Sequence, residues 1–366
     1  MTDDLTQYRL PGGQAIQPLP KIGLHEHLDG GVRPATIIEL AAEIGLELPA
    51  AGPDALADWF VDQCTGGDLV EYLKTFEITI ACMQTAAALE RVAREYVEDL
   101  AADGVVYAEI RWAPEQHLTR GLTPDEAVEA VQRGIEAGIE AVASHGHTIR
   151  IGQLIDALRQ FDHSLESAEV ALRWRERGVV GFDIAGPEAG FPAAQHRAAF
   201  DLLAEEFLPV TVHAGEGDGI ESIRGALIDG RALRLGHGVR IVEDILLEDD
   251  GPNSYATLGT VAQWVKDREI ALEIAPSSNL QTGAHGRTIE DHPFDLLYQL
   301  GFRVTVNPDN RLMSRTSITR ELAILADAFG YDLDDLAVFQ LNAAASAFLP
   351  VEDRDALSDL IANAYT

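Results

Sequence analysis

The stretch IGLHEHL (22–28) is a short apolar run that ends in two histidines, and similar runs recur along the chain. Seven more runs rich in Val, Ile and Leu follow it, at GVVYAEIRW (104–112), IRIGQLIDA (149–157), GVVGFDIAG (178–186), LPVTVHAG (208–215), LRLGHG (233–238), IALEIAPS (270–277) and FRVTVNPD (302–309). Amphipathic segments such as SAEVALRWRERG (167–178) and PAAQHRAAFDLLAEEF (192–207) lie between them. Eight strands that alternate with helices predict an α/β protein, and specifically a closed (β/α)8 TIM barrel.

An open, doubly wound sheet is the alternative fold for such a pattern. That fold places a glycine-rich phosphate-binding turn, G-x-G-x-x-G, after its first strand, whereas LHEHLDGG (24–31) lacks this pattern. No low-complexity tract or Ser/Gly linker divides the sequence. We therefore expect one barrel domain over residues 1–366.

The long gap from about residue 35 to 103 predicts several helices inserted between strands 1 and 2, and further helices follow the last strand. Within DLVEYLKTFEITI (68–80), an apolar stripe at helical spacing is formed by Leu69, Leu73, Phe76 and Ile80. Such a stripe either packs on the barrel or covers its mouth as a lid, and Leu73 and Phe76 are the candidate lid residues.

The composition narrows the classes of partner. The chain has 27 Lys and Arg against 60 Asp and Glu, a formal net charge of −33. Such a charge repels phosphate backbones and anionic headgroups, so we expect neither a nucleic-acid partner nor a membrane surface. The N-terminus MTDDLTQYRLPGG lacks a basic, apolar leader, and no run of about 20 apolar residues occurs. We expect a cytoplasmic protein.

Five residues of metal-binding or acid–base type end predicted strands: His25, His27, His213, His237 and Asp309. The histidines of His-x-His share one side of their strand because side chains alternate with period two. The carboxyl ends of barrel strands are where barrel enzymes assemble their active sites. Because the only cysteines, Cys64 and Cys82, lie 18 residues apart, a metal would be held by histidines and carboxylates.

Three imidazoles and one carboxylate suit Zn²⁺, which lowers the pKa of a bound water to about 7. We expect a single zinc ion per chain, because GFDIAGPE (181–188) offers no Lys that could bridge two metals. Glu216 follows His213 by three residues and is the candidate proton donor, although it could also be an exposed loop residue. His237 is then left over to orient or deprotonate the water.

Several motifs of the sequence, taken together, resemble one protein family. They are PKIGLHEHLDGGVRP, VVYAEIRWAPE, VVGFDIAGPEAG, VTVHAGEGDG, RLGHGVRI, LEIAPSSNLQTGA and VTVNPDNRLMSRTSITRE, in that order. Over about residues 19–348 the chain resembles the adenosine deaminase family, above all its actinobacterial-type members. The resemblance implies a zinc-dependent barrel hydrolase that converts adenosine and 2′-deoxyadenosine to inosine and 2′-deoxyinosine and releases ammonia.

The resemblance also implies roles for single residues. The zinc ligands would be His25, His27, His213 and Asp309. Glu216 would protonate purine N1, while His237 and Asp309 steer the attacking oxygen. The substrate would be held by His27, by Asp29 at the ribose 5′-hydroxyl, by the Gly186 N–H at purine N3 and by Asn310 at purine N7. Pro308, which stands where the family has a small polar residue, is the first suspect if metal binding is weak.

Other polar residues have structural interpretations. Glu109 and Arg111 alternate on one strand, and we expect them to form an internal ion pair. Ser277, Ser278 and Asn279 are expected to orient residues of the site. The remaining histidines are expected to face solvent; they are His117, His145, His147, His163, His196, His285 and His292.

Two alternative functions remain open. One is a related deaminase of another 6-aminopurine, such as adenine or aminodeoxyfutalosine, which would differ in the pocket for the N9 substituent. The other is a non-catalytic binding protein on the same barrel. Because Glu216 and all the candidate ligands are present, the sequence favours an enzyme.

Overall fold

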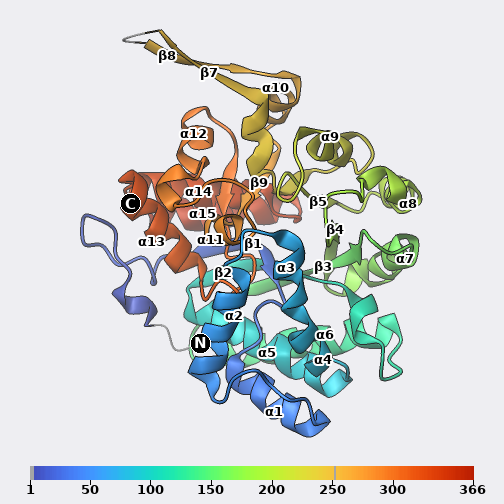
Figure 1. The fold of residues 1–366 in the computed structure, drawn as a ribbon. Coiled ribbons are helices and arrows are strands. Elements are labelled where there is room, and N and C mark those ends of the chain that lie inside the picture. The colour runs from blue at the N-terminus through green and yellow to red at the C-terminus, as the bar shows by residue number, and fades with distance from the viewer. Residues whose placement is uncertain (1–3, 251–252) are drawn as a thin grey trace.

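A computed structural model describes residues 4–250 and 253–366 and shows eight parallel strands surrounded by helices (Figure 1). Four strands form one sheet in chain order: β1 (Lys21–His27), β2 (Val105–Trp112), β3 (Arg150–Leu158) and β4 (Val179–Ala185). The other sheet has the order β10-β9-β6-β5, and its strands are β5 (Thr211–Ala214), β6 (Arg234–His237), β9 (Ala271–Ile274) and β10 (Val304–Val306).

Two parallel bridges join the two sheets at both edges. Phe182 on β4 pairs with Val210, and Glu26 on β1 pairs with Asp309 after β10. The eight strands therefore close into a ring, which confirms the predicted (β/α)8 barrel.

The last strand is shorter than predicted. Sequence analysis expects residues 302–309 to be extended, but β10 ends at Val306. Pro308 has no N–H to continue the ladder. Asp309 then bonds β1 on both sides of Glu26: its N–H donates to the His25 carbonyl at 3.1 Å, and its carbonyl accepts from the His27 N–H at 3.0 Å. These two bonds hold the candidate ligand Asp309 directly beside the His-x-His pair.

Helices fill the predicted insertion between β1 and β2. They are α1 (Pro34–Ile44), α2 (Pro53–Cys64), α3 (Leu69–Lys74), α4 (Phe76–Cys82) and α5 (Ala86–Ala102). The apolar stripe predicted over 69–80 is divided between α3 and α4, which meet at Thr75. The outer layer continues with α6 (Pro124–Ala143), α7 (Ser164–Trp174), α8 (Arg197–Glu205), α9 (Ile220–Ile228), α10 (Thr260–Asp267), α11 (Pro276–Gln281) and α12 (Phe294–Gln299). The predicted C-terminal helices are α13 (Ile318–Phe329), α14 (Leu333–Ser346) and α15 (Val351–Ala364).

An antiparallel hairpin that sequence analysis did not predict projects from the barrel next to α10 (Figure 1). Its strands are β7 (Ile245–Asp250) and β8 (Asn253–Leu258), and the residues between them lie outside the described part of the chain. Leu246 and Leu247 on β7 are both exposed.

The barrel interior holds a network of buried charges. The Arg234 Nη2 donates to Glu109 Oε2 at 2.5 Å, and its Nε donates to Glu273 Oε1 at 2.6 Å. Arg111 donates to Glu273 Oε2 at 2.6 Å and to Asp183 Oδ2 at 2.7 Å. The predicted ion pair between Glu109 and Arg111 is therefore wrong, because in the closed barrel each finds its partners on other strands.

Three of the histidines expected to face solvent are buried. They are His117, His196 and His292, each at most 3% exposed. Every one has a hydrogen-bond partner: His117 bonds the Met83 carbonyl, His196 bonds Ser164 and the Arg159 carbonyl, and His292 bonds Asn279. Their burial follows from the packing of loops over the strand ends, which a local sequence pattern does not encode.

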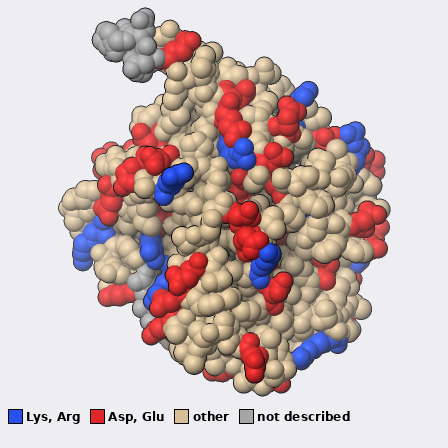
Figure 2. Space-filling view, in the orientation of Figure 1, with Lys and Arg blue, Asp and Glu red and all other residues tan. Residues whose placement is uncertain are grey.

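The remaining global predictions concern cysteine, charge and membranes. Cys64 and Cys82 are both buried free thiols. Acidic side chains are scattered over the face of the molecule in Figure 2 and outnumber the basic ones. No helix in the described residues is long and apolar enough to cross a bilayer. A cytoplasmic location stays a prediction of the sequence.

Candidate active site

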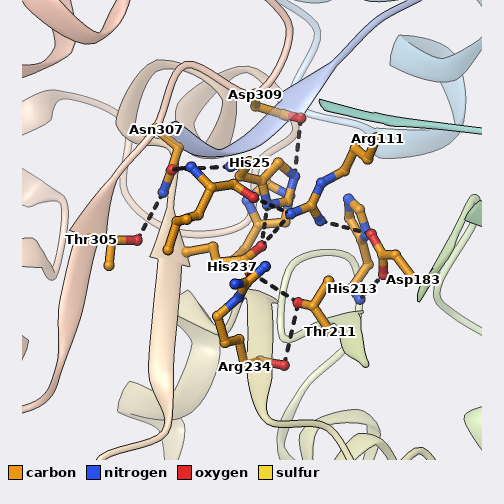
Figure 3. Close-up of polar contacts among 12 residues, drawn as sticks. His25, Arg111, Asp183, Thr211, His213, Arg234, His237, Thr305, Asn307 and Asp309 are labelled. Atoms are coloured by element: carbon orange, nitrogen blue, oxygen red, sulfur yellow. Dashed lines mark hydrogen bonds and ion pairs between the residues drawn. The ribbon is translucent and has the colours of Figure 1, made fainter. Parts of the chain in front are cut away.

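The four candidate metal ligands lie close together at the strand-end face of the barrel, and Figure 3 shows three of them, His25, His213 and Asp309. The Nε2 atoms of His25 and His27 each lie 3.3 Å from Asp309 Oδ1, and the Nε2 atoms of His27 and His213 are 3.2 Å apart. A tetrahedral ion with bonds of about 2.0–2.1 Å would place neighbouring ligand atoms about 3.3 Å apart. The observed spacing therefore matches what a metal would require.

Carboxylates deeper in the barrel hold two of these imidazoles by their other ring nitrogen. His25 Nδ1 lies 2.9 Å from Glu273 Oε2, and His213 Nδ1 lies 2.8 Å from Asp183 Oδ2. Arg111 contacts both carboxylates and so ties the two pairs together. A proton held on Nδ1 by a carboxylate leaves the Nε2 lone pair free for a metal.

The donor set fits a divalent cation. The buried Nε2 of His25 has no hydrogen-bond partner in the described residues, and Ser278 Oγ donates to the second oxygen of Asp309 at 2.6 Å. Three neutral imidazole nitrogens and one carboxylate oxygen form a set typical of Zn²⁺. The expectation that Ser278 orients a residue of the site is met by this contact.

Glu216 is buried beside these ligands rather than exposed in its loop. Its Oε1 lies 3.5 Å from His237 Nε2. Burial, the charge of Asp309 and the charge of Glu188 raise the pKa of Glu216 well above its ordinary value. A carboxyl group that keeps its proton near neutral pH is suited to general-acid chemistry.

One buried carboxylate holds the loop that carries Glu216. Glu188, in the loop after β4, accepts the backbone N–H of Gly215 on Oε1 at 2.7 Å. Its Oε2 accepts three more backbone N–H groups, those of Glu216, Gly217 and Asp218, at 3.0, 2.7 and 3.1 Å. Sequence analysis missed this residue, although Glu188 stands in the motif VVGFDIAGPEAG.

His237 ends β6 with a positive φ of 65°, and Asp309 has a φ of 60°. Non-glycine residues in this region are uncommon and are concentrated at functional sites. Burial and nearby His25 lower the pKa of His237 well below its ordinary value, so its ring is neutral. Asn279 Nδ2 lies 3.0 Å from its Nδ1, which meets the expectation that Asn279 orients a site residue.

A cavity of about 200 Å³ opens next to these groups. The polar side chains around it include His237 at the end of β6, and Glu216 and Asp309 in the loops that follow β5 and β10. A mainly apolar wall comes from α3 and α4. It is lined by Leu69, Tyr72, Leu73, Phe76 and Ile80, together with Glu77. The stripe therefore lines the mouth of the barrel, where a lid would lie.

The candidate substrate-binding residues His27, Asp29, Gly186 and Asn310 all line the same cavity. Asp29 is 5% exposed, its Oδ1 has no hydrogen-bond partner among the described residues, and burial raises its pKa to about 7. Gly186 has a φ of 94°, and a Cβ there would collide with Gln160.

Sequence analysis also missed a third carboxylate near the imidazoles. Asp156, at the end of β3, lies 3.9 Å from His27 Nδ1 and lines the cavity. It shares a sequence pattern with Asp183 and Glu273: each is a single acidic residue inside an apolar strand. Such a residue must be paired or solvated because an unpaired buried charge is costly, and this pattern could have identified all three.

Strand-end histidines, a strand-end aspartate and a buried acid around a cavity define a metal-dependent hydrolase on a (β/α)8 barrel. The comparisons with known proteins narrow this class. Residues 20–364 match the family model described as adenosine deaminase. The chain therefore belongs to the adenosine deaminase family.

Individual relatives agree with this assignment. The chain is 51% identical to adenosine deaminase 1 of Streptomyces coelicolor, over 98% of this chain and 90% of the relative. It is 50% identical to the adenosine deaminase of Mycobacteroides abscessus, over 94% of each chain. Among solved structures, an adenine deaminase from Arthrobacter aurescens superposes with a TM-score of 0.78 at 25% identity, covering 95% of this chain and 98% of that one.

Proposed function

We propose that this protein hydrolyses adenosine and 2′-deoxyadenosine to inosine and 2′-deoxyinosine with one Zn²⁺ per chain. Water adds its oxygen to purine C6, the bond from C6 to the exocyclic nitrogen breaks, and ammonia leaves. One proton of the water stays on N1 of the product, and the other leaves on the ammonia. The observation that carries the proposal is the buried Glu216, whose pKa is raised well above its ordinary value, beside a cluster of ligand-type atoms from His25, His27 and Asp309. The Nε2 of His213 lies 3.2 Å from that of His27 and so adjoins this cluster.

Each part of the site has a proposed task. His25, His27, His213 and Asp309 would hold the metal ion, which would supply a polarised water with a lowered pKa. Glu216 gives its proton to N1, which makes C6 electrophilic.

The substrate would be oriented by residues of the same cavity. His237 aligns the attacking oxygen, the Gly186 N–H faces N3, and the Asn310 amide donates to N7. Asp29 accepts the ribose 5′-hydroxyl, with His27 beside it. This agrees with an Asp29 oxygen that lies buried against the cavity without a partner.

Adenine is one alternative substrate, because an adenine deaminase shares the fold over nearly the whole chain. Free adenine has no sugar and would leave the Asp29 carboxyl without a hydroxyl to bind, and an unpaired buried polar group is costly. The two relatives at about 50% identity are both named adenosine deaminases. Both observations favour the nucleoside.

A substrate panel tests the proposal. Purified protein with its metal content measured would be incubated with adenosine, 2′-deoxyadenosine and adenine, and released ammonia and the hydroxypurine product would be quantified. We expect turnover of both nucleosides and a kcat/KM for adenine lower by at least about 100-fold. Metal-loaded protein that releases no ammonia from adenosine would reject the proposed function, and a preference for adenine would reject the proposed substrate.

A further inference from the structure

A row of three buried side chains runs from His237 away from the cavity, and the mechanism above uses only the first of them. Asn279, on α11, places Nδ2 3.0 Å from His237 Nδ1. The other end of the same amide, Oδ1, lies 3.3 Å from His292 Nε2. At the far end the backbone N–H of Phe294 donates to His292 Nδ1 at 3.1 Å. All three side chains are at most 3% exposed.

The direction of these hydrogen bonds can be derived from the far end. A backbone N–H can only donate, so His292 Nδ1 must be an acceptor and carries no proton. A neutral imidazole carries one proton, which must then sit on Nε2 and point at Asn279. Burial lowers the pKa of His292 to about 3, so a doubly protonated ring is excluded near neutral pH.

The proton on His292 fixes the next two groups. Because His292 Nε2 donates, the Asn279 atom facing it must be the carbonyl oxygen, and the amide nitrogen must face His237. The amide nitrogen can only donate, so His237 Nδ1 is an acceptor. The flipped amide would place two donors against each other at His292, which rules it out.

We propose that His292 and Asn279 form a tautomer relay that keeps the single proton of His237 on Nε2, the nitrogen that faces the cavity. His237 then donates a hydrogen bond to the attacking oxygen and does not remove its proton. His292 and Asn279 are positioning residues in this scheme, since they act through His237. The inference rests on the proposed function for its catalytic meaning, but the tautomer itself does not depend on any substrate.

The sequence left two roles open for His237, to orient the water or to deprotonate it. The relay favours the first of these roles. A neutral ring with its proton on Nε2 has no lone pair directed at the cavity and so cannot act as a base there. The same Nε2 lies 3.5 Å from Glu216 Oε1, and the His237 ring centroid is 4.6 Å from that of His25 and 5.4 Å from that of His213. A donor at this point would fix the orientation of an oxygen held by the metal ligands.

Nitrogen NMR of the metal-loaded protein tests the relay directly. The protein would be labelled with ¹⁵N-histidine, and long-range ¹H–¹⁵N correlations report which ring nitrogen carries the proton. His237 and His292 would be assigned from the spectra of substituted proteins. We expect an Nε2–H tautomer for both rings. A proton on Nδ1 of either ring, or a doubly protonated His237 at neutral pH, would overturn the proposal.

Variants add a functional readout. His292→Phe removes the relay, whereas His292→Gln keeps an N–H that can donate to Asn279. We expect kcat to fall on the order of tenfold in His292→Phe, with KM and metal content within about twofold, and to recover in His292→Gln. His117→Phe is the matched control, because His117 is also buried, hydrogen-bonds the Met83 carbonyl and contacts the Trp112 ring, which a phenyl ring can still do.

The outcomes separate the relay from the proposed function. Wild-type kcat in a folded, metal-loaded His292→Phe protein would contradict the relay's effect on turnover, as would equal losses in His117→Phe. If the His292→Phe protein does not fold, the tautomers measured by NMR in the unsubstituted protein still test the proposal. A protein with the expected tautomers that does not deaminate adenosine would keep the relay and reject the proposed function.

Discussion

The two walls of the cavity differ in what holds their side chains in place. Polar contacts do so on one wall, and apolar packing does so on the other. On the strand-end wall, three polar groups are held by a further buried partner: His25 by Glu273, His213 by Asp183, and the Glu216 loop by Glu188. The wall from α3 and α4 presents mainly apolar side chains and is held by packing. We infer that the chemistry depends on the strand-end wall. The wall from α3 and α4 excludes water and adds apolar contact with the substrate.

Removing a ligand from the polar wall should have the largest effect. Asp309→Ala deletes the carboxylate that contacts both His25 and His27. We expect it to lose most of its metal and to show no measurable turnover, because both the charge and a ligand are gone. Elemental analysis of the purified variant, alongside its rate with adenosine, checks this. Full metal content in the folded variant would exclude Asp309 as a ligand.

Glu216→Gln tests the proton donor on the same wall without touching the metal. The amide keeps the shape but has no acidic proton to give, so kcat should fall by about 10²–10⁴-fold. Metal content should be unchanged. Glu221→Gln, at an exposed position on α9, serves as the control. A variant that kept most of the rate would refute the donor assignment.

Glu188→Gln tests whether the support beneath Glu216 matters. An amide cannot accept all four backbone N–H groups that the carboxylate holds, because one of its two ends is itself a donor. We expect kcat to fall on the order of tenfold with metal content unchanged. Asp218→Asn is the matched control, because it changes a carboxylate of the same loop that accepts the Gly219 N–H and does not bond Glu188. Equal kinetics of the two variants would show that Glu188 only supports folding.

A substitution in the apolar wall should have the smallest effect on the kinetics, and this effect should appear in KM rather than in kcat. Phe76→Ala removes a ring that is 8% exposed at the cavity, and losing such contact with a bound ligand should raise KM on the order of tenfold. Steady-state kinetics with adenosine should show kcat within about twofold. Phe161→Ala, at an exposed ring outside this cavity, should change neither constant. A large fall in kcat with normal KM would mean that this wall takes part in the chemical step.

Much of this arrangement could be predicted from the sequence, because barrel strands carry a short-range signal. Each strand is an apolar run, and the residue at its carboxyl end faces the mouth. That rule predicts the positions of His25, His27 and His213 near the ends of β1 and β5, whereas Asp309 lies beyond the end of β10 at Val306. The same rule does not give strand lengths, and β10 ends early because Pro308 interrupts the ladder and Asp309 bonds β1 instead.

The features that sequence analysis did not predict depend on contacts between segments that are far apart in the chain. Glu109 and Arg111 alternate along β2, but closure of the barrel brings Arg234, Asp183 and Glu273 within reach of them. His292 lies in a polar stretch that looks exposed, yet Asn279 and Phe294 give it buried partners. The β7–β8 hairpin was not predicted, because its two strands form a separate antiparallel sheet and do not follow the alternation of strands and helices in the barrel.

Anomalous X-ray diffraction from crystals of the protein purified with its metal tests the central claim most directly. Data collected on both sides of the zinc absorption edge would locate the ion. A zinc site on these residues would give a single strong peak at about 2.0–2.2 Å from the Nε2 atoms of His25, His27 and His213 and from Asp309 Oδ1. Protein that deaminates adenosine but shows no peak at this position, or shows its metal on other residues, would contradict the account.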